Sequence, residues 1–210
     1  MNRAQWRDRL ENAAPEQVYE TLSRLLPLVN AEDLICLAPV ITARIPEMKP
    51  LVGFDQRSPH HAYDLYTHVS HVVAGVPEDL KLRWAALLHD IGKIDTFTQD
   101  ETGRGHYYGH ATVSAKMARD ILRRMRAPEA LGKQTAVLIE NHMTRLVPDK
   151  DQLRCQMDAL GWETLHQLLR LQKADMSSKG TGKLPNLESY AAIERILEEL
   201  REETERLVGV

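Results

Sequence analysis

The sequence predicts an all-α protein. Nearly every segment repeats apolar residues at intervals of three and four, which is the period of an α-helix. The alternation of apolar and polar residues that a half-buried strand requires is not convincing anywhere. Prolines mark several boundaries, with Pro77 at a first helical position and Pro128 between two helical segments. These observations together predict a bundle of helices.

The expected helices divide into three parts along the chain. Residues 1–50 form a helical extension without identifiable chemistry that packs on the core, and residues 51–185 form the functional domain. Residues 186–210 form a C-terminal amphipathic helix of the same globule. The expected ranges are Pro15–Leu26, Glu32–Arg44, Ala62–Ala74, Pro77–Ile91, His110–Arg126, Glu129–Met143, Trp162–Met176 and Leu187–Val208.

Two of the remaining features bear on function. The longest irregular stretch is Asp95–Gly109, and its Gly103-Arg104-Gly105 sequence predicts a small hairpin. A loop of this length in a compact helical domain is more often functional than idle. The last helix repeats apolar positions at steps of four and three, which predicts either a homodimer seam or, by default, packing on its own domain. These positions are Ile193, Leu197, Leu200, Thr204 and Leu207.

Composition restricts the classes of function. The chain has 210 residues, 43% hydrophobic and 27% charged, with a formal net charge of −3. That charge argues against binding nucleic acid through the whole surface. The start has no apolar signal region, and the most apolar window, DLICLAPVI, is too short to span a bilayer, so a cytoplasmic protein with no membrane contact is expected. Cys36 and Cys155 show no metal or redox spacing, which predicts reduced, mostly buried thiols.

The stretch Leu87–Lys93, LLHDIGK, places a histidine and an aspartate side by side in an apolar run. On a helical wheel, His89 and Asp90 lie opposite the main apolar stripe. Their neighbours on that side are Leu82 and Ala86, so this side is not solvated. We therefore expect both polar groups to line an interior wall.

Other helices aim ionisable groups inward in the same way. His68, His110 and His142 each lie on or at the end of an apolar stripe, and Asp175 ends another. Buried imidazoles and carboxylates must be paired, hydrogen-bonded or bound to metal. One divalent cation would satisfy several of these groups together.

Each group has a plainer interpretation when taken alone. A single histidine on an apolar stripe is more often a hydrogen-bonded core residue, and Asp175 could cap the following turn. Only the joint pattern favours a metal centre. The other histidines are expected at the surface or supporting the site from outside; they are His60, His61, His71, His106 and His166.

At this point the sequence resembles the HD superfamily of metal-dependent phosphohydrolases, an all-helical family. The family is marked by a histidine, a later His-Asp pair and a still later aspartate, here His68, His89-Asp90 and Asp175. The stretches YDLYTHV, LRWAALLHDIGK, YYGHATVSA and LIENHM are similar to the HD domain attached to bacterial CCA-adding tRNA nucleotidyltransferases, over about residues 51–182. The Gly-Ser and paired-aspartate pattern of a nucleotidyltransferase domain is not found, so CCA addition itself is not expected.

The resemblance implies phosphatase, 2′-nucleotidase and 2′,3′-cyclic phosphodiesterase activities that depend on divalent metal. His68, His89, Asp90 and Asp175 are expected to hold one ion; two imidazoles and two carboxylates suit Mn, Mg, Fe, Co or Ni. His110 and His142 are expected either to hold a second ion, with Asp90 bridging, or to contact substrate phosphate directly. Two ions about 3.5–4 Å apart would clamp the phosphoryl oxygens of an in-line displacement.

Further residues are candidates for substrate contact. Asp90 and Lys93 are the catalytic candidates, because the Lys93 ammonium could neutralise a phosphate oxygen; the alternative is a cation that favours a helix C-terminus. Arg104, Tyr107 and Tyr108 in the loop, and Arg145 after His142, are expected to bind substrate. Alternatively, the tyrosines pin the loop and Arg145 is a surface residue. Asp64, one turn before His68, is expected either to orient an imidazole or to lie at the surface.

The function expected from the sequence is therefore a metal-dependent phosphohydrolase that acts on a small phosphate ester, most directly a nucleotide, with an RNA 3′ end as a further partner. The alternative is a non-catalytic helical module that keeps the HD fold and binds RNA or a protein.

Overall fold

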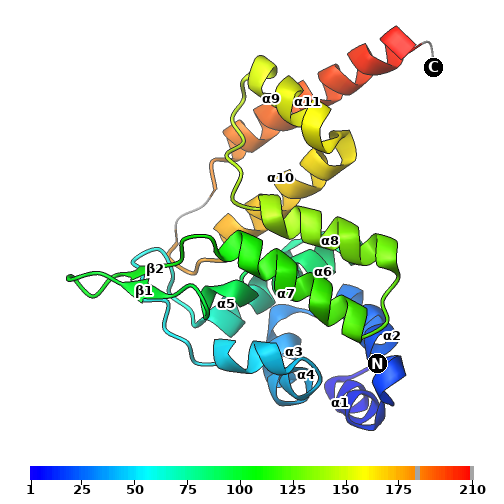
Figure 1. The fold of residues 1–210 in the computed structure, drawn as a ribbon, viewed down its shortest axis with the longest axis vertical. Helices are drawn as coiled ribbons and strands as arrows, with labels where there is room; N and C mark the ends of the chain where they lie inside the picture. The colour runs from blue at the N-terminus through cyan, green and yellow to red at the C-terminus, as the bar shows by residue number, and fades with distance from the viewer. Residues whose placement is uncertain (183–184, 209–210) are drawn as a thin grey trace.

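A computed structural model describes residues 1–182 and 185–208, and it is almost entirely helical (Figure 1). The α-helices are α1 Arg3–Asn12, α2 Val18–Leu25, α3 Ala31–Cys36, α4 Ala38–Arg44, α5 Leu65–Gly75, α6 Leu80–Leu88, α7 His110–Arg124, α8 Glu129–Asn141, α9 Lys150–Leu160, α10 Trp162–Ser177 and α11 Leu187–Val208. The short 3₁₀ turns are η1 Pro15–Gln17, η2 Leu26–Leu28, η3 Pro46–Leu51 and η4 Ile91–Lys93. The predicted all-α class is confirmed.

The centre of the molecule is formed by α5, α6, α7, α8 and α10. Helix α5 packs against α6 and α10, while α8 packs against α6 and α7. Helices α1 to α4 lie at one end of this centre, and α9 and α11 lie at the other end (Figure 1). One continuous cluster of buried apolar side chains runs from Trp6 and Leu10 in α1 to Leu197 and Leu200 in α11. The N-terminal extension and the last helix therefore share the core of the central helices.

Several helix boundaries differ from the predicted ones because of local capping. Helix α5 begins at Leu65, three residues later than expected, because the Asp64 carboxylate accepts from the Thr67 amide at 2.7 Å. The expected helix Glu32–Arg44 is divided into α3 and α4, and Leu37 between them has φ −89° and ψ 0°. Pro39, which has no amide hydrogen, occupies the first turn of α4.

Two helices are absent from the sequence-based prediction. Helix α1 buries only Trp6 and Leu10, and Asn2 caps it in a reciprocal arrangement with Gln5. Helix α9 likewise buries only Leu153 and Met157. Two buried positions in a short segment are too few to establish a period.

The hairpin predicted in the long loop is confirmed. Strands β1 Thr98–Gln99 and β2 Gly105–His106 pair antiparallel, with Thr98 opposite His106. The hairpin projects from the edge of the helical body (Figure 1).

The apolar seam of α11 packs against other helices of the same chain. Ile193, Leu197 and Leu200 are buried, and the helix packs on α9 and α10, whereas Leu207 is 85% exposed. The apolar seam is thus buried against helices of the same chain. The prediction of buried thiols is wrong: Cys36 and Cys155 are both exposed and free.

No described helix is both long enough and apolar enough to cross a membrane.

Candidate metal centre

The His-Asp pair lies just beyond the end of a helix, not within it as predicted. Helix α6 ends one residue before His89, and Asp90 has φ −108° and ψ 6°, outside the helical region. The 3₁₀ turn that follows packs tightly on the start of α7. A β-carbon on Gly92 would lie 2.7 Å from the Ser114 amide nitrogen and 2.9 Å from the His110 carbonyl oxygen. Glycine at this position therefore lets the pair approach the first turn of α7.

The Asp90 carboxylate lies between two pairs of imidazoles. Its Oδ2 atom is 3.6 Å from His68 Nε2 and 3.2 Å from His89 Nε2. Its Oδ1 atom is 3.3 Å from His110 Nε2 and 3.8 Å from His142 Nε2. The side chain is 3% exposed. Each oxygen of one buried carboxylate thus faces a separate group of nitrogens.

Asp175, at the end of α10, lies on the His68 side of this arrangement. Its Oδ1 atom is 3.0 Å from His68 Nε2, and its Oδ2 atom is 3.6 Å from the Lys179 ammonium. Within each of two groups, ligand atoms lie no more than 4.8 Å apart, a spacing that suits a shared cation. The groups are His68, His89 and Asp175, and Asp90, His110 and His142.

The four imidazoles share one hydrogen-bonding arrangement. In each, Nδ1 lies within hydrogen-bond distance of a main-chain carbonyl oxygen, which can only accept, so Nδ1 carries the proton. A neutral ring then presents the Nε2 lone pair to the centre, which is how ligand histidines are oriented in metal sites. For His68, His89, His110 and His142 in turn, the acceptors are the carbonyl oxygens of Ser178, Ala86, Tyr107 and Ile139, at 3.1, 2.8, 2.7 and 2.6 Å.

Several of these lone pairs have no protein donor. His68 Nε2 and His89 Nε2 are buried without a hydrogen-bond partner. His110 Nε2 and His142 Nε2 lie 3.1 Å apart, and two unprotonated nitrogens at that distance repel each other unless a proton or cation lies between them. Buried polar atoms are normally satisfied. The donor set of imidazole nitrogens and carboxylate oxygens therefore fits a divalent ion.

The pKa values follow from burial and from neighbouring charges. Burial raises the pKa of Asp90, but the charges of His89 and Lys93 outweigh it and hold that pKa well below its ordinary value. Burial lowers the pKa of His89, while the Asp90 charge opposes it, and the net shift is upward. Burial and the charge of His89 lower the pKa of His142 to about 4. At neutral pH, Asp90 is thus ionised and His142 neutral, the forms that metals bind, whereas the raised pKa of His89 favours a protonated ring that releases its Nε2 proton when a metal binds.

Lys93 is buried beside the same carboxylate. Its ammonium lies 2.8 Å from Asp90 Oδ2 and 5.2 Å from the centre of the Tyr107 ring. The side chain therefore brings a positive charge to the edge of the centre.

Asp64 does not orient an imidazole. Its carboxylate caps α5, and the His68 ring is held by the Ser178 carbonyl. The interpretation of Asp64 as an imidazole acceptor is thus contradicted by the hydrogen bonds, because the capping geometry turns its side chain toward main-chain amides.

The loop candidates fall into two groups. Tyr107 is part of an aromatic cluster with Phe54 and Phe97. This packing agrees with the alternative interpretation, in which Tyr107 pins the loop to the core and does not bind substrate. Tyr108 is 81% exposed and stacks on His106. The side chains of Arg104 and Arg145 are exposed and make no hydrogen bond or ion pair with the described residues.

Two residues near the centre were not singled out from the sequence. Gln56 is 1% exposed and accepts a hydrogen bond from the Lys93 ammonium at 2.9 Å. His61, considered only as a surface or supporting residue, packs edge-on against His68 with ring centres 4.9 Å apart. Burial and the charge of Lys93 lower the pKa of His61 to about 3. Both residues lie between η3 and α5, where no helical period could indicate which side chains face inward.

Comparison with known proteins shows which family this chain belongs to. The family model described as "HD domain" matches residues 63–176, which is more than half of the chain. The chain belongs to the HD domain family. The matched range of this HD domain contains every residue of the two candidate groups.

The HD domain is also homologous to part of several tRNA nucleotidyltransferases. The whole chain is 34% identical over 207 residues to an A-adding tRNA nucleotidyltransferase of Deinococcus radiodurans, and the alignment covers 93% of this chain and 47% of that protein. It is 37% identical over 149 residues to a CC-adding tRNA nucleotidyltransferase of Thermus thermophilus, covering 67% of this chain and 34% of that protein. The chain thus spans about half or less of the length of these relatives.

Proposed function

We propose that this HD domain is a metal-dependent phosphohydrolase that acts on a small phosphate ester, namely a nucleotide, a cyclic nucleotide or the terminal phosphate of an RNA 3′ end. The observation that carries the proposal is the orientation of the four imidazoles. Each offers Nε2 to a centre that also contains the two oxygens of Asp90. A hydrogen-bonded core would not need so many buried acceptors in one place.

The ligand assignment follows the two groups. His68, His89, Asp90 and Asp175 would hold one ion, and Asp90, His110 and His142 offer a second position. Mixed nitrogen and oxygen donors suit Mn, Mg, Fe, Co or Ni. When bound, such an ion polarises a phosphoryl oxygen and activates water.

The chain's own charges complete the proposed chemistry. The Lys93 ammonium is fixed beside Asp90 and would face negative charge that develops on the phosphoryl oxygens. Arg104 and Arg145 are exposed guanidinium groups available to a longer anionic substrate such as RNA.

The test is a screen of metals against phosphate esters. Mg, Mn, Fe, Co, Ni and Zn would be crossed with nucleoside monophosphates, 2′,3′-cyclic phosphates and an aryl phosphate. We expect metal-dependent hydrolysis in the wild type and a loss of more than about a hundredfold in His89→Gln and Asp90→Asn, since loss of even an outer partner of a metal ligand has effects of about that size. His166→Gln and Asp151→Asn, in α10 and α9, are matched controls that should retain activity.

A second function is favoured by the relatives, whose names refer to tRNA. A non-catalytic RNA-binding module would bind RNA in a separate binding assay and would hydrolyse no ester with any metal in this screen. Unchanged hydrolysis in His89→Gln would reject the metal centre as the source of activity.

A further inference from the structure

The Lys93 ammonium is held in one orientation by several neighbours. An ammonium has three N–H donors and no acceptor. One donor faces Asp90 Oδ2 at 2.8 Å, and another faces Gln56 Oε1 at 2.9 Å. The charge also lies 5.2 Å from the centre of the Tyr107 ring, within reach of a cation–π interaction. One N–H therefore remains for an atom outside this cluster.

Gln56 can hydrogen-bond to the Lys93 ammonium only through its amide oxygen. Because the ammonium cannot accept, the amide must present Oε1 to it, and its NH₂ group must turn the other way. Gln56 Nε2 faces the Tyr63 carbonyl at 3.5 Å. The residue is 1% exposed, so water does not compete for Oε1. The Lys93–Gln56 hydrogen bond is thus a buried, charge-assisted contact.

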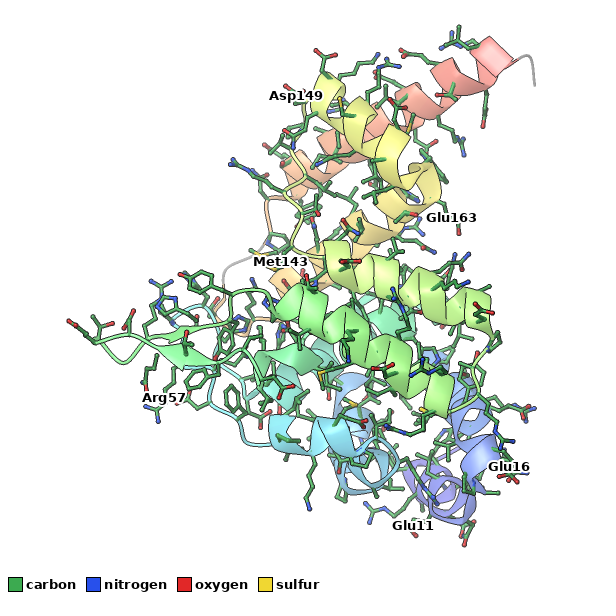
Figure 2. All side chains as sticks on the ribbon, viewed as in Figure 1. Glu11, Glu16, Arg57, Met143, Asp149 and Glu163 are labelled. Atoms are coloured by element: carbon green, nitrogen blue, oxygen red, sulfur yellow. The ribbon has the colours of Figure 1, made fainter. Side chains whose placement is uncertain are left out.

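Residues of the hairpin and of the loop after it hold the main chain of Gln56 and Arg57 in place. Its carbonyl accepts a hydrogen bond from the Tyr107 hydroxyl, and the Arg57 carbonyl accepts from the Gly105 amide at 2.8 Å. A β-carbon on Gly105 would lie 2.6 Å from the Gln56 carbonyl oxygen, so only glycine permits this approach. Figure 2 shows Arg57 beside the hairpin.

The turn at this point is also conformationally unusual. Arg57 has φ 49°, the left-handed region that non-glycine residues rarely adopt, and its amide donates to Asp55 Oδ1 at 2.8 Å. Such residues persist where their surroundings enforce them, and they concentrate at functional sites. The turn sets the direction in which the neighbouring Gln56 side chain enters the interior.

From these contacts we propose that Gln56 is a positioning residue of the active site, which fixes the Lys93 ammonium so that its remaining N–H meets the substrate phosphoryl group. The inference rests on the proposed function. It extends the site beyond the imidazole–carboxylate centre to the turn of residues 55–57 and to the hairpin that holds this turn. Gln56 acts through Lys93 and does not itself touch substrate.

The test is a double-mutant cycle on the metal-loaded protein. Gln56→Met keeps the length of the side chain and removes the amide oxygen, and Gln56→Ala is a second variant. Binding of inorganic phosphate is measured by calorimetry, alongside kcat and KM. We expect about a tenfold loss of phosphate affinity and of kcat/KM, the size expected for one hydrogen bond to a charged group. Mn²⁺ affinity should stay within about twofold, because Gln56 lies outside both candidate ligand groups.

The same substitutions in a Lys93→Met background show whether Gln56 acts through Lys93. If Gln56 acts through Lys93, its replacement there should change phosphate affinity by less than about twofold. An undiminished loss in that background, or none in the wild-type background, overturns the inference. Gln167→Ala, which removes another buried glutamine, should leave phosphate affinity unchanged.

Phosphate binding also separates this inference from the proposed function. A wild type that neither binds phosphate nor hydrolyses any phosphate ester overturns both. A wild type that hydrolyses phosphate esters but binds no phosphate overturns the positioning role alone. A wild type that binds and hydrolyses phosphate esters, with Gln56→Met unimpaired, overturns the positioning role alone.

Discussion

At the scale of single residues, the hydrogen bonds at Nδ1 decide what each histidine can do. The sequence indicated that His68, His110 and His142 point inward, because each lies on or at the end of an apolar stripe. It indicated the same for His89, because the neighbours of His89 opposite the main stripe are apolar. It could not indicate which ring nitrogen faces the centre. That depends on main-chain carbonyls, such as those of Ser178 and Ala86, whose positions no side-chain pattern encodes.

Side-chain patterns also failed at two other residues, because they do not show where main-chain groups lie: Asp64 was misinterpreted and Gln56 was missed. Asp64 lies one helical turn from His68, a spacing that suits an imidazole acceptor, but a carboxylate before the first turn of a helix is drawn to the free amides there. Gln56 lies in a turn without periodicity, so its burial became visible only when the hairpin was placed against it.

A prediction at this scale concerns His142 in metal-free protein. Burial lowers the pKa of His142 from 6.5 to about 4, so between these values the unfolded chain binds a proton that the folded chain does not. Stability from this residue is therefore complete above pH 6.5 and is lost as the pH falls toward 4. Between pH 7 and pH 5 we expect His142→Gln to lose less stability than the wild type, by roughly 1–2 kcal/mol.

Urea unfolding at the two pH values, with chelator present, measures this difference. His60→Gln replaces an exposed histidine and should follow the wild type. An equal loss of stability in His142→Gln and the wild type would contradict the burial of a neutral His142.

At the scale of elements, long periodic helices could be predicted and short ones could not. Helices α7, α8 and α10 lie close to their expected ranges because each buries a continuous stripe. Helix α6 is shorter than expected, since Asp79 caps its start by accepting from the Leu82 amide at 3.0 Å. Its early end frees Asp90 from helical geometry, whereas His89 keeps helical backbone angles, and the two adjacent side chains reach the same centre.

The hairpin gives the prediction at this scale. In Gly105→Ala the new β-carbon would meet the Gln56 carbonyl oxygen at 2.6 Å and Phe97 Cε2 at 3.0 Å. We expect a loss of about 1–3 kcal/mol in unfolding free energy, the range for forced overpacking. Chemical denaturation measures it.

Gly132→Ala is the matched control. This glycine lies within α8, and its nearest neighbour, the Leu122 Cβ atom, would be at an ordinary 3.9 Å. Because alanine is a better helix former, this variant should gain about 0.5–1 kcal/mol. If Gly105→Ala were as stable as the wild type, the hairpin would not be seated on the turn at Gln56.

At the scale of the whole molecule, the fold class was predicted fully and the assembly of the site only in outline. Helical periods establish an all-α bundle, but they do not determine which helix ends meet. The structure brings α5, the end of α6, the start of α7, the end of α8 and the end of α10 to one centre. We infer that residues 51–185 carry the chemistry, while buried residues of α1 to α4 and of α11 share its core.

The central claim is that this meeting point holds a divalent cation. The most direct measurement is an anomalous-difference map from crystals of the wild-type protein grown with Mn²⁺. We predict a peak about 2.0–2.3 Å from His68 Nε2, His89 Nε2 and carboxylate oxygens of Asp90 and Asp175, with a second peak next to His110 and His142 if two ions bind. A well-resolved map without a peak in contact with these groups would contradict the account.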